Sequence, residues 1–127
     1  MATSPAFAAT PRIGAVSVAT ADASYTAPTN VGTLITGAST GTRISEIVCK
    51  CAATSAAAII RIFLYDGSTY WLFDEVSIPA ATGSATVLQS RVSTSYSNLI
   101  LPSSSWSVRV TTSVSQATHI TALGGDL

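Results

Sequence analysis

The stretch Ile59–Val76, with the sequence IIRIFLYDGSTYWLFDEV, decides the fold of this chain. Aspartate followed by glycine between two apolar runs is the strongest short-range signal for a β-hairpin. Asp66 and Gly67 stand near the centre of the stretch, and five of the nine aromatic residues of the chain lie within it. The sequence therefore predicts two antiparallel strands joined by a tight turn.

A four-residue loop from Asp66 to Thr69 is the turn that we favour over a two-residue loop. It brings aromatic residues opposite aliphatic ones and a basic residue opposite an acidic one, and both kinds of cross-strand pair are favourable. The pairs that it predicts are Tyr65 with Tyr70, Leu64 with Trp71, Phe63 with Leu72, Ile62 with Phe73 and Arg61 with Asp74.

Both faces of this hairpin are apolar, whereas a strand in a two-sheet sandwich buries only one face. The side chains that we assign to the core are Ile60, Ile62, Leu64, Trp71 and Phe73. The side chains left on the other face are Phe63, Tyr65, Tyr70 and Leu72. A loop, the N-terminal segment or a neighbouring subunit has to cover this second face.

An exposed apolar patch with a polar rim usually marks an interface. We therefore expect self-association through the tip of the hairpin, and the candidate subunit-interface residues are Phe63, Tyr65, Tyr70, Trp71 and Leu72. Surfaces rich in tyrosine and tryptophan also bind sugars, so a glycan-binding module that uses Tyr65, Tyr70 and Trp71 is the alternative.

Short segments with alternating apolar side chains recur along the rest of the chain, between turn signals. They span residues 13–20, 32–36, 43–52, 85–93, 96–101, 106–112 and 117–123. About eight short strands with this spacing are typical of an antiparallel β-sandwich or jelly roll. In segment 43–52 we assign Ile47, Cys49 and Cys51 to the core, and Ile44, Glu46, Val48 and Lys50 to the outer face.

The length of 127 residues is that of one domain. We assign residues 13–127 to a single sandwich domain. Residues 1–12, rich in alanine, threonine and proline, are expected to form an extended arm. We expect this arm to dock on a partner through Phe7 and Arg12.

Charged residues make up only 9% of the chain, against about 25% in typical globular proteins. A surface with so little charge, and a net charge of zero, suits a subunit that is embedded in an assembly or a secreted domain. The six basic residues are scattered, so we expect no nucleic acid partner. We expect no membrane span, because no run of about 18 apolar residues occurs, and no signal peptide.

The residues that usually carry chemistry are few and isolated. His119 is the only histidine, and Asp74 and Glu75 are adjacent, so on a strand they face opposite ways. We interpret Cys49 and Cys51 as small buried apolar residues, with an intersubunit disulfide as the alternative. We therefore expect no catalytic residues, no metal, no cofactor and no enzymatic activity.

Four stretches of the chain resemble segments of small structural proteins of tailed bacteriophages. They are ATPRIG at 9–14, GASTGTRISEI at 37–47, RIFLYDGSTYW at 61–71 and ALGGD at 122–126. The resemblance implies a virion component that is made in the host cytoplasm, most plausibly a homotrimeric decoration protein that docks on the major capsid protein. A head-fibre or tail-fibre module that binds a receptor or glycan is the neighbouring interpretation.

Overall fold

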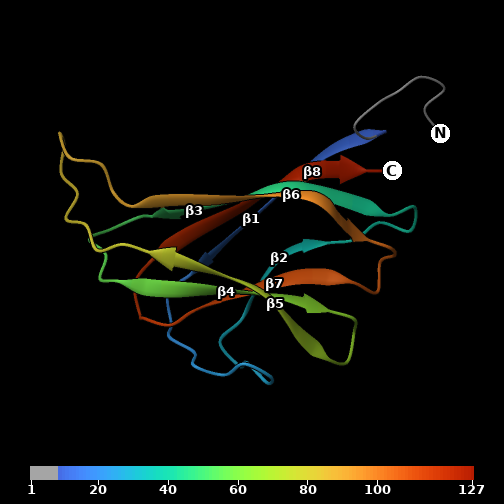
Figure 1. Ribbon diagram of the computed structural model, residues 1–127, viewed down its shortest axis with the longest axis horizontal. Helices are drawn as coiled ribbons and strands as arrows, with labels where there is room; N and C mark the ends of the chain where they lie inside the picture. The colour runs from blue at the N-terminus through green and yellow to red at the C-terminus, as the bar shows by residue number, and fades with distance from the viewer. Residues whose placement is uncertain (1–8) are drawn as a thin grey trace.

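The computed structural model describes residues 9–127, which form eight strands and no helix (Figure 1). The strands are β1 (Thr10–Val18), β2 (Gly32–Thr36), β3 (Thr42–Cys51), β4 (Ala58–Tyr65), β5 (Tyr70–Ile78), β6 (Arg91–Leu101), β7 (Ser107–Thr112) and β8 (Thr118–Asp126). The prediction of an all-β domain with about eight short strands is confirmed. The described residues thus contain no helix that is long and apolar enough to cross a membrane.

Two antiparallel sheets of four strands lie face to face, with strand orders β1-β8-β3-β6 and β2-β7-β4-β5 (Figure 1). Each strand of the first half of the chain pairs with one of the second half: β1 with β8, β2 with β7, β3 with β6 and β4 with β5. This nested pairing, wrapped into two sheets, is the topology of a jelly roll. The β4–β5 hairpin lies at its centre in the chain, and β5 and β6 are edge strands on the same side of the sandwich.

The inner faces of the two sheets form one apolar core. The larger side chains that it buries completely include Ile44, Ile47, Ile60, Ile62, Val108, Val110 and Ile120. Cys49 and Cys51 also lie in this core as free thiols, 0% and 1% exposed, as the alternation of β3 predicts. Burial in this apolar environment, together with the neighbouring Cys51, raises the pKa of the Cys49 thiol to about 12. The burial of both sulfurs leaves neither in reach of a second subunit.

The register of the hairpin agrees with the prediction only near the turn. Tyr65 pairs with Tyr70, Leu64 with Trp71 and Phe63 with Leu72, as predicted. A β-bulge at Phe73 then shifts β5 by one residue. Ile62 therefore faces Asp74 and Arg61 faces Glu75, so the predicted pairs of Ile62 with Phe73 and of Arg61 with Asp74 are wrong. A bulge of this kind adds one residue to the strand and reverses the faces of the residues beyond it.

A second bulge, at Ser45 in β3, corrects the assignment of Ile44 to the outer face. Ile44 is completely buried in the core on the same face as Ile47, although the two residues are three positions apart. Its partner Gly124 has to be glycine, because a Cβ there would collide with the carbonyl oxygen of Arg43.

Residues 79–90 form a loop, and the strand predicted over residues 85–93 is wrong. β6 begins only at Arg91 and continues through the segment predicted at residues 96–101. The loop projects beyond the sheets at one end of the molecule (Figure 1, left). It has no neighbouring strand to pair with, apart from one isolated bridge between Ser55 and Ala81.

The predicted boundary between arm and domain, at residues 12 and 13, also differs from the structure. β1 begins at Thr10 and pairs with β8 from its first residue, so Thr10, Pro11 and Arg12 belong to the sandwich. Residues 1–8, and with them Phe7, lie outside the described part of the chain.

Candidate self-association surface

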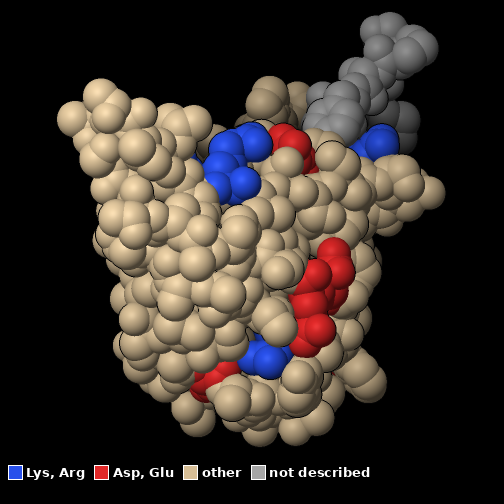
Figure 2. Space-filling view, turned by 60° about the vertical axis from the view of Figure 1, so that its left-hand side comes forward, with Lys and Arg blue, Asp and Glu red and all other residues tan. Residues whose placement is uncertain are grey.

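The most apolar exposed surface of the hairpin lies on β5. Its consecutive residues Trp71, Leu72 and Phe73, which we call the β5 patch, are 54%, 41% and 41% exposed. β5 pairs only with β4, so its other edge presents unpaired backbone N–H and C=O groups beside the patch. Charged side chains are few and lie in small separate clusters on an otherwise uncharged face (Figure 2).

The other three edge strands carry features that discourage pairing with another chain. β1 contains Pro11 and Arg12, β2 has only five residues, and β6 exposes mostly serine, asparagine and arginine. Natural sheets protect their edges by prolines, charges and short strands of this kind. β5 is nine residues long and contains no proline; it has a bulge and two acidic residues, Asp74 and Glu75, but it also exposes the aromatic side chains of Trp71 and Phe73. It is therefore the edge that is best suited to contact another chain.

A rigid turn holds the beginning of the β5 patch. The Asp66 carboxylate accepts hydrogen bonds from the backbone N–H groups of Ser68 (2.9 Å) and Thr69 (2.8 Å) and from Nε1 of Trp71 (3.1 Å). These bonds, that of Thr69 first, lower the pKa of Asp66 to about 2, so its carboxylate stays charged. Gly67 has a φ of +103°, which favours glycine. The indole of Trp71 is thus oriented before any partner binds.

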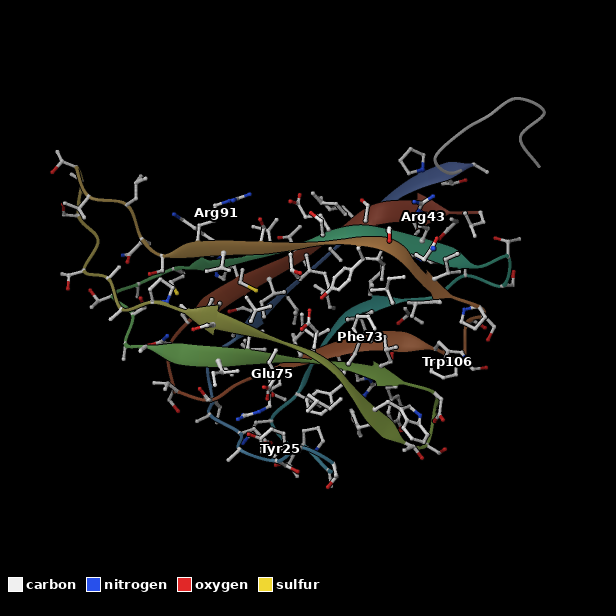
Figure 3. The ribbon with its side chains drawn as sticks, in the orientation of Figure 1. Tyr25, Arg43, Phe73, Glu75, Arg91 and Trp106 are labelled. Carbon is white, nitrogen blue, oxygen red and sulfur yellow. The ribbon has the colours of Figure 1, made fainter. Side chains whose placement is uncertain are left out.

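Phe73, the residue at the bulge, points toward the opposite sheet, where its ring lies 5.4 Å from that of Tyr96 on β6 (Figure 3). The Tyr96 hydroxyl donates a 2.8 Å hydrogen bond to the Asp74 carboxylate and so links the two edge strands. Burial, followed by this bond, raises the pKa of Tyr96. Leu72, Phe73, Asp74 and Glu75 line a shallow hollow of about 400 Å³, which we call the β5 hollow. Leu72 and Phe73 make one part of its lining apolar, and Asp74 and Glu75 make the other part acidic.

Phe63 does not belong to the candidate interface, because it is completely buried within the chain. It lies on the outward side of β4, where the ring of Tyr70 packs edge-on against it at 5.9 Å. Tyr70 and Tyr65 are half-buried and stack on each other at 4.3 Å. The guanidinium of Arg109 lies 4.2 Å from the Tyr65 ring and donates a 3.2 Å hydrogen bond to the Tyr70 hydroxyl. Of the predicted interface residues, the exposed ones are Trp71 and Leu72.

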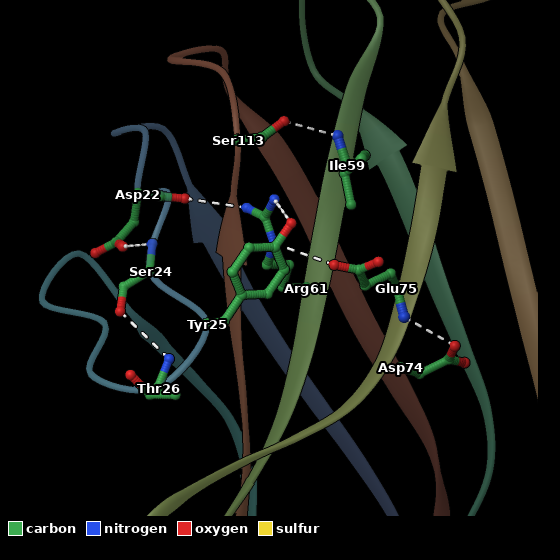
Figure 4. Close-up of polar contacts among 9 residues, drawn as sticks. All are labelled: Asp22, Ser24, Tyr25, Thr26, Ile59, Arg61, Asp74, Glu75 and Ser113. Carbon is green, nitrogen blue, oxygen red and sulfur yellow. Dashed lines mark hydrogen bonds and ion pairs between the residues drawn. The ribbon is translucent and has the colours of Figure 1, made fainter.

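The second face of the hairpin is covered near Arg61 by the loop of residues 19–31 (Figure 4). Arg61 is only 6% exposed, and its guanidinium lies 4.4 Å from the ring centre of Tyr25. It donates hydrogen bonds to the Tyr25 hydroxyl (3.2 Å) and to the Asp22 carbonyl oxygen (3.4 Å), and it pairs with Glu75 at 3.2 Å. The sequence left open whether a loop, the N-terminal segment or a neighbouring subunit covers the second face. Near Arg61 it is a loop.

Arg12, the predicted docking residue, makes its contacts within the chain. Its guanidinium lies 3.1 Å from the Asp126 carboxylate and donates a 2.8 Å hydrogen bond to the Thr36 carbonyl oxygen. The Thr42 hydroxyl donates to the same carboxylate at 2.7 Å. This bond, and then Arg12, hold the pKa of Asp126 below its usual value. Arg12 thus fastens the start of β1 to the end of β8, and docking through Phe7 and Arg12 stays a prediction.

Four exposed apolar residues near the candidate surfaces differ from their predicted positions. The sequence places Trp71 and Phe73 in the core, whereas they are 54% and 41% exposed, and it places Val87 and Leu88 on a strand. The bulge at Phe73 has no sequence signal. Pro79 and Gly83 are signals for a loop, but the alternation that comes after them is equally typical of a strand. Within the described residues, no group of three or more His, Cys, Asp or Glu side chains could hold a metal ion.

Comparison with known proteins adds no relative. No protein-family model matches this chain, and no curated protein is similar to it.

Proposed function

We propose that this chain is a non-enzymatic structural subunit that self-associates through β5. As the resemblance in its sequence implies, the assembly is the head of a tailed phage, where the chain decorates the shell and contacts the major capsid protein. In this role the subunit acts by burying apolar surface. A subunit that bridges neighbouring capsid proteins adds association free energy at contacts that internal pressure would otherwise separate.

The single observation that carries this proposal is the exposed β5 patch on an edge strand. Exposed tryptophan and phenylalanine on a long edge strand without proline or lysine are unfavourable for a free monomer. Their burial against another chain would remove this disadvantage. Jelly rolls occur in viral capsid and lectin domains among others, so the fold agrees with the proposal by analogy only.

The alternative, a glycan-binding fibre module, has less support in the geometry. Sugar rings stack on flat aromatic faces that are open to solvent. The rings of Tyr65 and Tyr70 lie against each other, and Arg109 covers the Tyr65 ring. Trp71 is thus the only one of the three proposed platforms with more than half of its surface exposed.

Self-association is expected to weaken by about 30-fold or more when Trp71 is replaced by serine, since central tryptophans carry about 2 kcal/mol or more of binding free energy in protein interfaces. Analytical ultracentrifugation over a concentration series measures the change. Ile13→Ser is the matched control, because Ile13 is also an exposed apolar residue, 68% exposed, but lies on β1. A wild-type chain that sediments as a monomer at high micromolar concentration would contradict the proposal.

Location on the head is expected to give hundreds of copies in each virion. Quantitative mass spectrometry of purified virions of the phage that encodes the chain measures the copy number, and gold-labelled antibody in electron micrographs shows its position. A fibre module would instead give only a few copies, with label at the fibres.

A further inference from the structure

The loop of residues 79–90 carries a pair of exposed apolar residues, Val87 and Leu88, where its Ser84–Val87 turn ends; we call this pair the tip. Leu88 is 84% exposed, the highest value among the large apolar side chains of the described chain, and Val87 is 53% exposed. The loop contains no charged residue. It projects beyond the sheets at one end of the long axis of the molecule (Figure 1). Loops of about this length in compact domains usually have a function.

Hydrogen bonds hold this loop in one shape. Ser55 and Ala81 exchange two backbone hydrogen bonds, of 2.9 and 3.0 Å, at its first part. The Ser90 hydroxyl donates to the Pro79 carbonyl oxygen at 2.6 Å and so closes its base. A turn from Ser84 to Val87, with a 2.9 Å bond between Ser84 N and Val87 O, shapes the tip. A tip that is ordered in advance loses little conformational entropy when it binds.

The β5 hollow is the complementary feature, and it lies near the middle of the long axis, where Figure 3 labels Phe73 and Glu75. The first half of β5, which contains Leu72 and Phe73, is next to the β4–β5 turn, away from the loop along the long axis (Figure 1). The hollow has a volume of about 400 Å³, and its apolar part continues the β5 patch. It is open to solvent, and an aliphatic side chain of another chain could lie against its apolar part.

The charges around the two features have opposite signs. Lys50 and Arg91 are paired neighbours on β3 and β6 at the base of the loop, where Lys50 Nζ donates a 2.9 Å hydrogen bond to the Gln89 carbonyl oxygen (Figure 3 labels Arg91). Asp74 and Glu75 form the acidic part of the β5 hollow. A loop tip that enters the hollow brings its basic base toward these two carboxylates. Complementary potentials of this kind favour one partner and one orientation.

We propose that the Val87–Leu88 tip of one copy inserts into the β5 hollow of a second copy. This inference rests on the proposed self-association and specifies its contact. Because the tip and the hollow are different surfaces of the chain, the contact is head-to-tail, and such contacts close into rings when the rotation between copies permits. The trimer that the resemblance implies would be one ring of this kind.

The sign of a charge placed at the tip tests this contact. Leu88→Asp is expected to weaken association by at least about tenfold, because it loses the apolar contact and faces Asp74 and Glu75. Leu88→Lys loses the same apolar contact but carries the opposite charge, so it is expected to associate more tightly than Leu88→Asp, with a difference that falls in high salt. Unchanged thermal unfolding of both variants, followed by circular dichroism, shows that the fold is kept. Equal association of the two variants would overturn the proposal.

Mixing two defective variants tests the head-to-tail arrangement. Leu88→Asp has an intact hollow, and Leu72→Asp has an intact tip, so each is expected to associate weakly alone, whereas the mixture is expected to form a one-to-one heterodimer at concentrations where each variant alone is a monomer. Sedimentation and native mass spectrometry detect this species, and a mixture of Leu88→Asp with Ile13→Asp is the control.

A monomeric mixture, or Leu88→Asp that associates like the wild type, would overturn the contact. If Leu88→Asp keeps wild-type association but loses binding to phage heads, the tip contacts the capsid protein and the proposal is wrong. These outcomes do not contradict self-association through Trp71. A monomeric wild-type chain, in contrast, would contradict both proposals.

Discussion

Replacing Phe63 by alanine is expected to lower the free energy of unfolding by about 3–5 kcal/mol, the usual cost of removing a buried phenylalanine ring. The side chain is 0% exposed, and the Tyr70 ring packs against it from outside. The aromatic and arginine side chains around Phe63 are attached to a β-sheet, which limits their movement. They can therefore fill the cavity that the missing ring leaves only in part. Urea denaturation followed by tryptophan fluorescence measures the change.

Self-association of the folded Phe63→Ala chain is expected to remain close to that of the wild type, because the residue offers no surface to a partner. Trp71→Ser is the converse control, with a large loss of association and a small loss of stability. A Phe63→Ala variant that unfolds like the wild type but no longer associates would restore Phe63 to the interface and contradict the buried position.

Replacing Arg61 by alanine is expected to lower the free energy of unfolding by about 2–4 kcal/mol. The change removes a buried cation that contacts the Tyr25 ring, two hydrogen bonds to the loop of residues 19–31, and the aliphatic part of the side chain. It leaves Glu75 unpaired, but the Glu75 side chain is 40% exposed and water can solvate it. The loss is therefore expected to lie toward the lower end of the cost of breaking a buried ion pair.

Hydrogen exchange of the amides in residues 22–30 locates this effect, since the loop is expected to open more often without Arg61. Glu75→Gln is the matched control: it removes only a partly solvated ion pair and is expected to cost less than about 1 kcal/mol. The Asp22 carboxylate also accepts hydrogen bonds from the backbone N–H groups of Ser24, Thr29 and Asn30. If the amides of the loop stay equally protected in Arg61→Ala, these bonds alone hold the loop in place.

The hairpin shows how far local sequence signals extend. The Asp66–Gly67 turn and the first three cross-strand pairs were predicted correctly, because a turn type fixes the register of the residues next to it. Beyond Phe63 the prediction failed at the bulge. No residue at 73 signals a bulge, and phenylalanine fits a regular strand equally well. The shifted register brings Glu75 opposite Arg61 and lets Asp74 bond to Tyr96, a partner from the other sheet that the local sequence does not reveal.

The residues of the candidate surfaces were also predicted only in part. Trp71 and Leu72 were named from their place near the tip of the hairpin, and both are exposed. Phe63 was named by the same alternation and is buried, since Tyr70 and its neighbours pack over it. Leu88 was missed because apolar alternation at residues 85–93 resembles a strand. Whether such a segment becomes a strand depends on an available partner strand, and residues 79–90 have none beyond the Ser55–Ala81 bridge.

By itself the sequence determined the all-β class, the number of strands, the central hairpin and the burial of Cys49 and Cys51, because these depend on turn residues and on alternation over a few positions. The tertiary structure alone decided which strands became edges, where the two bulges fall and which apolar side chains stay exposed. These depend on pairing between segments that are far apart in the chain, as when β1 meets β8 and β3 meets β6. A side chain is buried or exposed according to what the other half of the chain places against it.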